Sequence, residues 1–449
     1  MTDTAAPAFD PAATLRSRQF VRLLFVASVV GLVISLLAWG FLELIHVIQE
    51  GLFTHLPSGL GFSDVPWWWP LPILVLAGLP VAYAELRPGR GGHIPAEGLK
   101  VATTTPDMLI GVLIAALASL GLGLVLGPEA PLIALGGGFT VLLVKELRKD
   151  VPQQALLVLG AAGSFAAVSM IFQSPVVAAV LVIEATGLGG PTLPLVLLPG
   201  LLAAGIGSLT FIGVSSWAGL DTSAYSMAPL SLPSFAAPTW GDIGWSVLLA
   251  VVAAALVFVV RRVGLRVVPF AASRPYVTLP CAGAVVAILA IAFAQVTDHG
   301  TEQVLFSGQD ALPGLVAQSS SWSAGALALV ILCKALAWAI SLGTFRGGPT
   351  FPALYLGAAG GLLASYLPGL GITPAVAVGM AAMAASMLRL PLSSIVIATA
   401  LTVVAGAGTA PLIVVGAVTA YLVTLTLDRW VQPQPSPATP AEAVVPAAV

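Results

Sequence analysis

Charged residues are scarce in this chain. Lys, Arg, Asp and Glu make up 8% of its 449 residues, whereas a soluble protein averages roughly 25%. Hydrophobic residues make up 58%, and the mean hydropathy is +1.03. So few charges cannot cover the surface of a water-soluble domain of this length. The composition therefore predicts an all-α, multi-pass protein of the plasma or inner membrane, in direct contact with the lipid bilayer.

Residues that build metal, redox and hydrolytic sites are also rare. The two cysteines, Cys281 and Cys333, lie in apolar runs without a metal-ligand or redox spacing, and we interpret them as small core residues. The four histidines are scattered and form no HExxH motif. Aspartates are nearly absent from the apolar runs. A zinc, aspartyl or Ser–His intramembrane protease is thereby disfavoured, and we expect no enzyme activity, cofactor, metal or nucleic-acid partner.

Long apolar runs dominate what is present. A membrane span needs about 20 apolar residues, and eight runs qualify: 20–47, 70–86, 108–126, 191–214, 243–264, 276–295, 322–343 and 410–428. Shorter apolar pieces, interrupted by Gly and Pro, lie at 129–147, 153–172, 174–187, 350–367, 374–388 and 391–406. Such pieces at matching places in two halves are typical of inverted-repeat transporters with broken, re-entrant helices.

Two pairs of segments match at an offset of about 220 residues. "GPEAPLIALGGG" (127–138) aligns with "GPTFPALYLGAA" (348–359), and the segments that begin at Gly160 and Gly379 each contain a Ser-Met pair followed by Pro. The repeated order predicts a duplication. We divide the chain into a cytoplasmic tail (1–19) without a cleavable signal peptide, a first transmembrane repeat (20–214), a linker (215–242), a second repeat (243–430) and a disordered tail (431–449).

Glu129 is the one charge in the first matching segment. A helix that starts inside the membrane directs free N–H groups and the positive end of its dipole toward the midplane, which favours a small anion. Two such starts, one per repeat, would face each other. An ionised Glu129 could occupy the anion's place and leave when it is protonated, which makes it a gate. It could equally cap its own helix.

These residues resemble the CLC family of chloride channels and proton-coupled chloride antiporters. "GGHIP" (91–95), "GPEAP" (127–131) and "GPTFP" (348–352) stand in the order and spacing of the three family motifs, and the resemblance covers residues 20–428. It implies the CLC fold, a homodimer with one pore per subunit, and a gate at Glu129. The anion contacts that it implies are Gly92, His93, Ile94, Gly127, Ala130, Thr350, Phe351 and, near the C-terminus, Tyr421.

The chain departs from the family pattern at several of these positions. Gly92 stands where the family has its anion-coordinating serine, and Tyr421 falls one helix earlier than the family's tyrosine. Ala185 stands at the place of the second, proton-carrying glutamate of the antiporters. Its neighbour Glu184 would point about 100° away on a helix. These two positions are the weak candidates for a proton path.

The loss of that glutamate favours a passive channel for chloride or a similar small anion, gated by Glu129. The alternative within the family is an antiporter that couples chloride or fluoride to protons. From a different class, a secondary transporter of a small organic anion would use the same half-helix starts.

Overall fold

The computed structural model describes residues 11–87, 91–99, 105–218 and 227–431. Within these ranges the regular elements are helices. In the first half they are α1 (Pro11–Leu15), α2 (Arg18–Glu50), α3 (Leu56–Gly59), α4 (Pro70–Glu85), α5 (Pro106–Gly121), α6 (Glu129–Leu147), α7 (Gln153–Ile171), α8 (Pro175–Thr186) and α9 (Leu193–Ala218). In the second half they are α10 (Trp240–Ser273), α11 (Pro275–Val296), α12 (Ala311–Ala317), α13 (Ala324–Thr344), α14 (Thr350–Ala364), α15 (Ile372–Leu388), α16 (Pro391–Leu401) and α17 (Thr409–Val431). Short η turns connect several of them, including η2 (Pro95–Glu97).

Eight of the described helices are long and apolar enough to cross a membrane. This confirms the expected all-α, multi-pass architecture. The individual spans differ from the prediction. Helices α6 and α7, predicted as interrupted pieces, contain 19 residues each and are among the eight, whereas the predicted spans 70–86 and 108–126 form α4 and α5, which have 16 residues each and are not among the eight. The helices α8, α14 and α16 are short, at 12, 15 and 11 residues. Each has a Pro at or directly before its first residue, and α8 also ends at Gly187 in the left-handed conformation.

The two halves contain matching helix pairs. The pair α6–α7 packs closely, and a side chain added at Gly136 would place its Cβ 2.4 Å from the Gly163 carbonyl oxygen. The pair α14–α15 has the same contact: a Cβ at Gly357 would lie 2.4 Å from the Gly379 carbonyl oxygen. Small residues let backbones approach inside a membrane, where van der Waals packing replaces the hydrophobic effect. Equivalent glycine contacts at corresponding places support the expected duplication.

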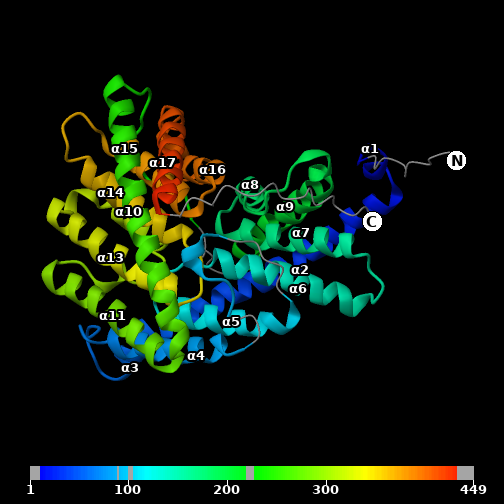
Figure 1. Ribbon diagram of the computed structural model, residues 1–449, viewed down its shortest axis with the longest axis horizontal. Helices are drawn as coiled ribbons and strands as arrows, with labels where there is room; N and C mark the ends of the chain where they lie inside the picture. The colour runs from blue at the N-terminus through cyan, green and yellow to red at the C-terminus, as the bar shows by residue number, and fades with distance from the viewer. Residues whose placement is uncertain (1–10, 88–90, 100–104, 219–226, 432–449) are drawn as a thin grey trace, which may run out of the picture.

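The halves are interleaved rather than separate. Figure 1 shows α5 to α9 on one side and α10 to α17 on the other, with α4 lying beneath the second group. A Cβ at Gly283 of α11 would lie 2.0 Å from the Leu74 carbonyl oxygen of α4, so these two helices are in direct backbone contact. The first half therefore supplies a helix to the packing of the second.

The segment between the halves is shorter than the predicted linker, 215–242. Helix α9 extends to Ala218 and α10 begins at Trp240, where Thr239 and Asp242 form a capping box. The described part of the connection, 227–239, hydrogen-bonds to both halves: the Met227 amide donates to the Ile171 carbonyl at 3.1 Å, and the Leu230 amide donates to the Leu401 carbonyl at 2.7 Å. The connection thus packs along both halves. Of the predicted tails, 1–19 and 431–449, residues 1–10 and 432–449 lie outside the described residues. The described part of the first tail contains α1 and the start of α2, and Val431 is the last residue of α17.

Candidate functional site

The matching segments 127–131 and 348–352 are in direct contact. The Gly127 amide donates to the Gly348 carbonyl at 2.7 Å, and the Gly348 amide donates back to the Gly127 carbonyl at 2.5 Å. We call this reciprocal pair the glycine bridge. Helix α6 begins two residues after Gly127, and α14 begins two residues after Gly348. The two helix starts, one from each repeat, are therefore held side by side, as the repeat predicted.

Glu129 lies across this junction. Its side chain is fully buried, and its Oε1 accepts a hydrogen bond at 2.5 Å from the Thr350 amide, the first residue of the opposite helix. Oε2 has no hydrogen-bond partner among the described residues. The glycine bridge makes room for this carboxylate, because a Cβ at Gly348 would lie 2.0 Å from its Cδ and one at Gly127 would lie 2.2 Å from its Oε2. The carboxylate thus reaches across the repeats to the start of α14.

The first turns of α6 and α14 keep the amides that the sequence analysis singled out. Pro131 and Pro352, third in their helices, have no N–H, so the donors of the first turns are Glu129, Ala130, Thr350 and Phe351. The Phe351 ring is 1% exposed and stacks on Phe172 at 5.6 Å between ring centroids. Gly127 differs from expectation because its amide is already used by the glycine bridge. In this conformation Gly127 contributes space for Glu129 rather than a free donor.

The segment 91–98 explains one departure from the family motif. Gly92 has φ +107°, a conformation that L side chains rarely adopt, so a serine would be strained there. The ring of His93 is involved in the local turn, with Nε2 2.6 Å from the Gly98 carbonyl oxygen. Ile94 is the N-cap residue of η2. Residues 92–94 line a cavity of about 430 Å³, which also includes Arg346.

Arg346 is a cation that the sequence analysis missed. It lies two residues before Gly348 and is 5% exposed, and its guanidinium forms an ion pair with Glu85 at the end of α4. Its amide donates to the Ser119 hydroxyl at 3.1 Å. The sequence signal was a basic residue, "FRGGPTFP", directly beside the second matching segment. The adjacency could have suggested a charge near the helix starts, but only the fold shows its partner.

The two weak proton-path candidates have different surroundings. Glu184 accepts hydrogen bonds from the Leu392 amide at 3.0 Å and from the Ser393 amide and hydroxyl at 2.6 Å each. It therefore caps the N-terminus of α16, in the other half of the chain. Ala185 is half-buried against the core and has no titratable group.

Tyr421 lies in α17, whose main packing partners are α10, α15 and α16 rather than the helices of the glycine bridge. A different tyrosine lies in α14 itself. Tyr355 is fully buried, and its hydroxyl donates to the Gln303 Oε1 at 2.7 Å. The buried Lys334 ammonium lies 4.5 Å from the centre of its ring and is surrounded by the carbonyl oxygens of residues 303–306. Composition alone does not show which of the two tyrosines, Tyr355 or Tyr421, belongs to a helix that starts at the glycine bridge.

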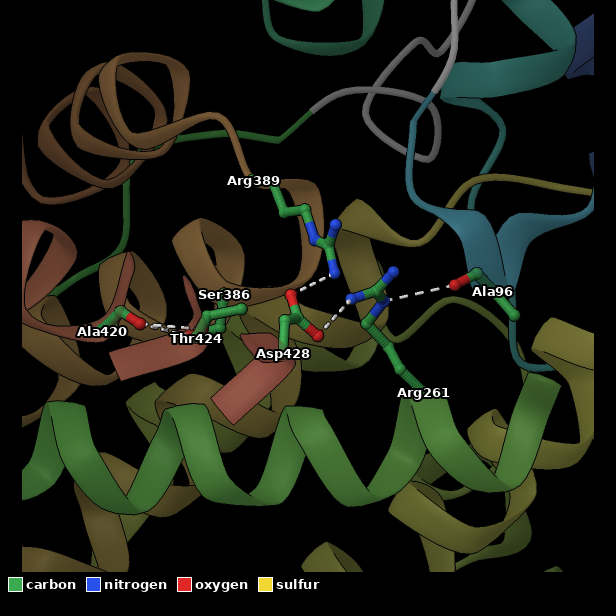
Figure 2. A network of polar contacts seen from close by, with 7 residues as sticks. All are labelled: Ala96, Arg261, Ser386, Arg389, Ala420, Thr424 and Asp428. Carbon is green, nitrogen blue, oxygen red and sulfur yellow. Dashed lines mark hydrogen bonds and ion pairs between the residues drawn. The ribbon is translucent and has the colours of Figure 1, made fainter. Parts of the chain in front are cut away.

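A second charged cluster contacts η2 through Arg261. Figure 2 shows Asp428, near the end of α17, between the guanidinium groups of Arg261 and Arg389. The Arg261 Nε donates to the Ala96 carbonyl at 3.2 Å. Arg389 ends α15 in the left-handed conformation, φ +58°. The cluster joins α10, α15 and α17 to the segment that carries Gly92 and His93.

Comparison with known proteins gives consistent results. The sequence profile of the voltage gated chloride channel family matches residues 90–425. The protein named "Putative ion-transport protein YfeO" from Escherichia coli O17:K52:H18 (strain UMN026 / ExPEC) is 30% identical over 357 residues, which are 78% of this chain and 80% of the relative.

Solved structures agree with the fold. A slow cyanobacterial Cl⁻/H⁺ antiporter superposes with a TM-score of 0.71 at 18% identity, over 90% of this chain and 95% of that one. A CLC-type fluoride/proton antiporter superposes with a TM-score of 0.64 at 17% identity, over the same shares. Together, the profile match, the YfeO relative and the shared fold show that the chain belongs to the CLC family of anion channels and transporters, as a multi-pass membrane protein and not an enzyme.

Proposed function

We propose that this chain conducts chloride, or a similar small anion, through a site at the starts of α6 and α14, with Glu129 as the gate. The hydrogen bond from the Thr350 amide to Glu129 carries the proposal, because it joins the carboxylate to a donor that an anion would use. An anion that displaces the carboxylate would find the amides of Ala130, Thr350 and Phe351 within the first turns of the two helices.

Two observations support passive conduction. Ala185 cannot carry a proton, and Glu184 is held by three hydrogen bonds as the cap of α16. An antiporter is the second candidate, because two of the similar solved structures are described as a Cl⁻/H⁺ and a fluoride/proton antiporter. In either case protonation of Glu129 would release the amides, so anion flux should rise as the pH falls.

The test is the variant Glu129→Gln in liposomes with a chloride gradient. Glutamine is uncharged and competes only weakly for the amides, so we expect anion flux to rise about tenfold. A tenfold change corresponds to the lower end of the free energy of one charge-assisted hydrogen bond. We also expect the pH dependence to flatten. Chloride efflux and the internal pH are recorded together, and fluoride efflux is measured in parallel.

Glu146→Gln is the matched control, because Glu146 is exposed at the far end of the same helix. Unchanged flux in Glu129→Gln would leave Glu129 a helix cap. Chloride efflux without proton movement supports the channel, coupled movement supports the antiporter, and an absence of halide flux in the unmodified protein contradicts the proposal.

A further inference from the structure

We propose that the outer face of α10 binds the headgroup of an anionic phospholipid through Arg262 and Arg266, which we call the arginine pair. The site lies on the surface of the molecule that faces lipid. It uses no residue of the glycine bridge and none that lines the cavity beside residues 92–94. The inference therefore does not depend on the conduction of chloride.

The arginine pair follows the part of α10 that can lie in hydrocarbon. Residues 243–260 contain no charged side chain, and Arg262 comes two positions later. Trp240, at the other end of the helix, is 89% exposed, and tryptophan is typical of the membrane–water interface. A rise of 1.5 Å per residue puts Trp240 about 33 Å from Arg262 along the axis, close to the thickness of a hydrocarbon core. We therefore expect the arginine pair at the level of the headgroups of the opposite leaflet.

The arginine pair continues the side of α10 that is exposed to lipid. Val252 and Val259 are each 56% exposed, and the two arginines follow Val259 at intervals of three and seven residues. Residues at this spacing share one side of a helix. Arg261, about 100° around the helix from Arg262, is instead buried in the charged cluster of Figure 2. Neighbouring arginines of α10 thus serve different surroundings, and the arginine pair is directed toward the bilayer.

No carboxylate neutralises this end of the α10–α11 hairpin. The side chains of Arg262, Arg266 and Arg274 form no ion pair or hydrogen bond with another described residue, and residues 243–297 contain no Asp or Glu. The Arg262 guanidinium lies over the Phe258 ring, 5.9 Å from its centre, which leaves its N–H groups available. Arginine binds phosphate oxygens through two parallel hydrogen bonds. A phospholipid headgroup supplies those oxygens, and its acyl chains would lie along the apolar part of the same face.

An anionic lipid fits this surface better than a second copy of the chain. A symmetric contact between two copies of this face would bring arginines together and bury them without a carboxylate, which is costly. Free phosphate would form the same hydrogen bonds but would gain nothing from the apolar face. All four charged residues of 243–297 are arginines within 261–274, so this end of the hairpin is predicted to be cytoplasmic. The negative surface of the cytoplasmic leaflet attracts such residues.

The experiment titrates the full chain in detergent with phosphatidylglycerol and follows the rise of its unfolding temperature, which gives an apparent affinity. An arginine near an anionic membrane surface contributes about fivefold in affinity. We therefore expect Arg262→Gln and Arg266→Gln to weaken binding about fivefold each, and the double variant about thirtyfold. The double variant to lysine, which keeps both charges, should keep most of the affinity. Phosphatidylcholine, which has no net charge, should bind weakly and equally to all of these proteins.

The matched control combines Arg148→Gln with Lys149→Gln, because it removes two exposed cations from the loop between α6 and α7. Unchanged phosphatidylglycerol affinity in the double glutamine variant of the arginine pair, or an equal loss in the control, would overturn the proposal. Inorganic phosphate that protects as well as the lipid at equal concentration would also overturn it, and so would a lower oligomeric mass of the variant, which would indicate a second copy as the occupant. Because binding is measured without ion flux, its result stands or falls separately from the conduction proposal.

Discussion

At the scale of single residues, the glycines of the bridge matter for the space that they leave. Gly127 and Gly348 exchange backbone hydrogen bonds, and their missing side chains leave a slot that the Glu129 carboxylate fills. An isolated buried carboxylate is costly unless it is hydrogen-bonded or neutral, and here one oxygen has a backbone donor. The position of the carboxylate therefore depends on two residues that have no side chain at all.

Gly348→Ala tests this dependence. The new methyl group would lie 2.0 Å from the Glu129 Cδ, so the flexible carboxylate must move away from the Thr350 amide. We expect chloride flux to rise toward that of Glu129→Gln and to lose most of its pH dependence, measured in the same liposome assay. Gly360→Ala is the control, because a Cβ there meets no atom within 4 Å. A flux and pH profile identical to the unmodified protein would contradict the role of the slot.

Several residues of the site could be predicted from the sequence, and others could not. The match between 127–131 and 348–352 placed Glu129, Thr350 and Phe351 correctly beside the second helix start. The use of the Gly127 amide in the bridge was not predictable, because it depends on how closely two backbones approach. Arg346 was missed because its importance comes from Glu85, which is 261 positions away in the sequence.

At the scale of helices, Glu184 connects the two repeats. It belongs to α8 and caps α16 through two backbone amides and a hydroxyl. The free N–H groups at a helix start favour a carboxylate through hydrogen bonding and through the helix dipole. The N-terminus of α16 therefore explains why the otherwise apolar helix α8 contains the charged residue Glu184.

Glu184→Ala should lower the stability of the protein by about 1–2 kcal/mol, the usual cost of removing a capping side chain. The unfolding temperature in detergent measures this loss, and Glu146→Ala, an exposed site on α6, is the control. Chloride flux per folded protein should remain unchanged. A variant with normal stability and altered proton movement would instead assign Glu184 to a proton path.

Helix positions were the most predictable level of the structure. Apolar runs located the helices because this signal is local, but they did not settle helix length: α4 and α5 are shorter than the predicted spans, and α6 and α7 are long enough to cross a membrane despite their Gly and Pro residues. The exact ends of the linker were less accurate: α9 continues to Ala218 and α10 starts at Trp240. Those ends depend on caps and on packing between distant segments, which apolar periodicity does not report.

At the scale of the whole molecule, the resemblance to the CLC family leads us to expect a homodimer. Two chains of 45.5 kDa would give a particle of about twice that protein mass. Light scattering of the detergent-solubilised protein, corrected for detergent, measures it. A mass equal to a single chain over a range of protein concentrations would contradict the expectation.

The charged cluster in Figure 2 joins parts of the chain that are far apart in the sequence. Asp428 lies three residues before the end of α17, yet through Arg261 it is connected to Ala96 in the first half. The last described helix and the segment that lines the cavity are thus held by the same arginine. The repeat predicted that two halves exist, but it did not predict which charges join them.

The glycine bridge also limits how this protein can move. Transporters with two similar halves often turn over by rocking one half against the other about a central binding site. Here a pair of backbone hydrogen bonds joins the halves at the starts of α6 and α14, and α4 is packed into the opposite half. A rocking movement that separated the halves at these two places would have to break both contacts. Under the gating role proposed for Glu129, the smallest movement that frees the amides is a rotation of its side chain, and we therefore expect turnover to need new torsion angles at Glu129 and no change in the overall shape of the protein.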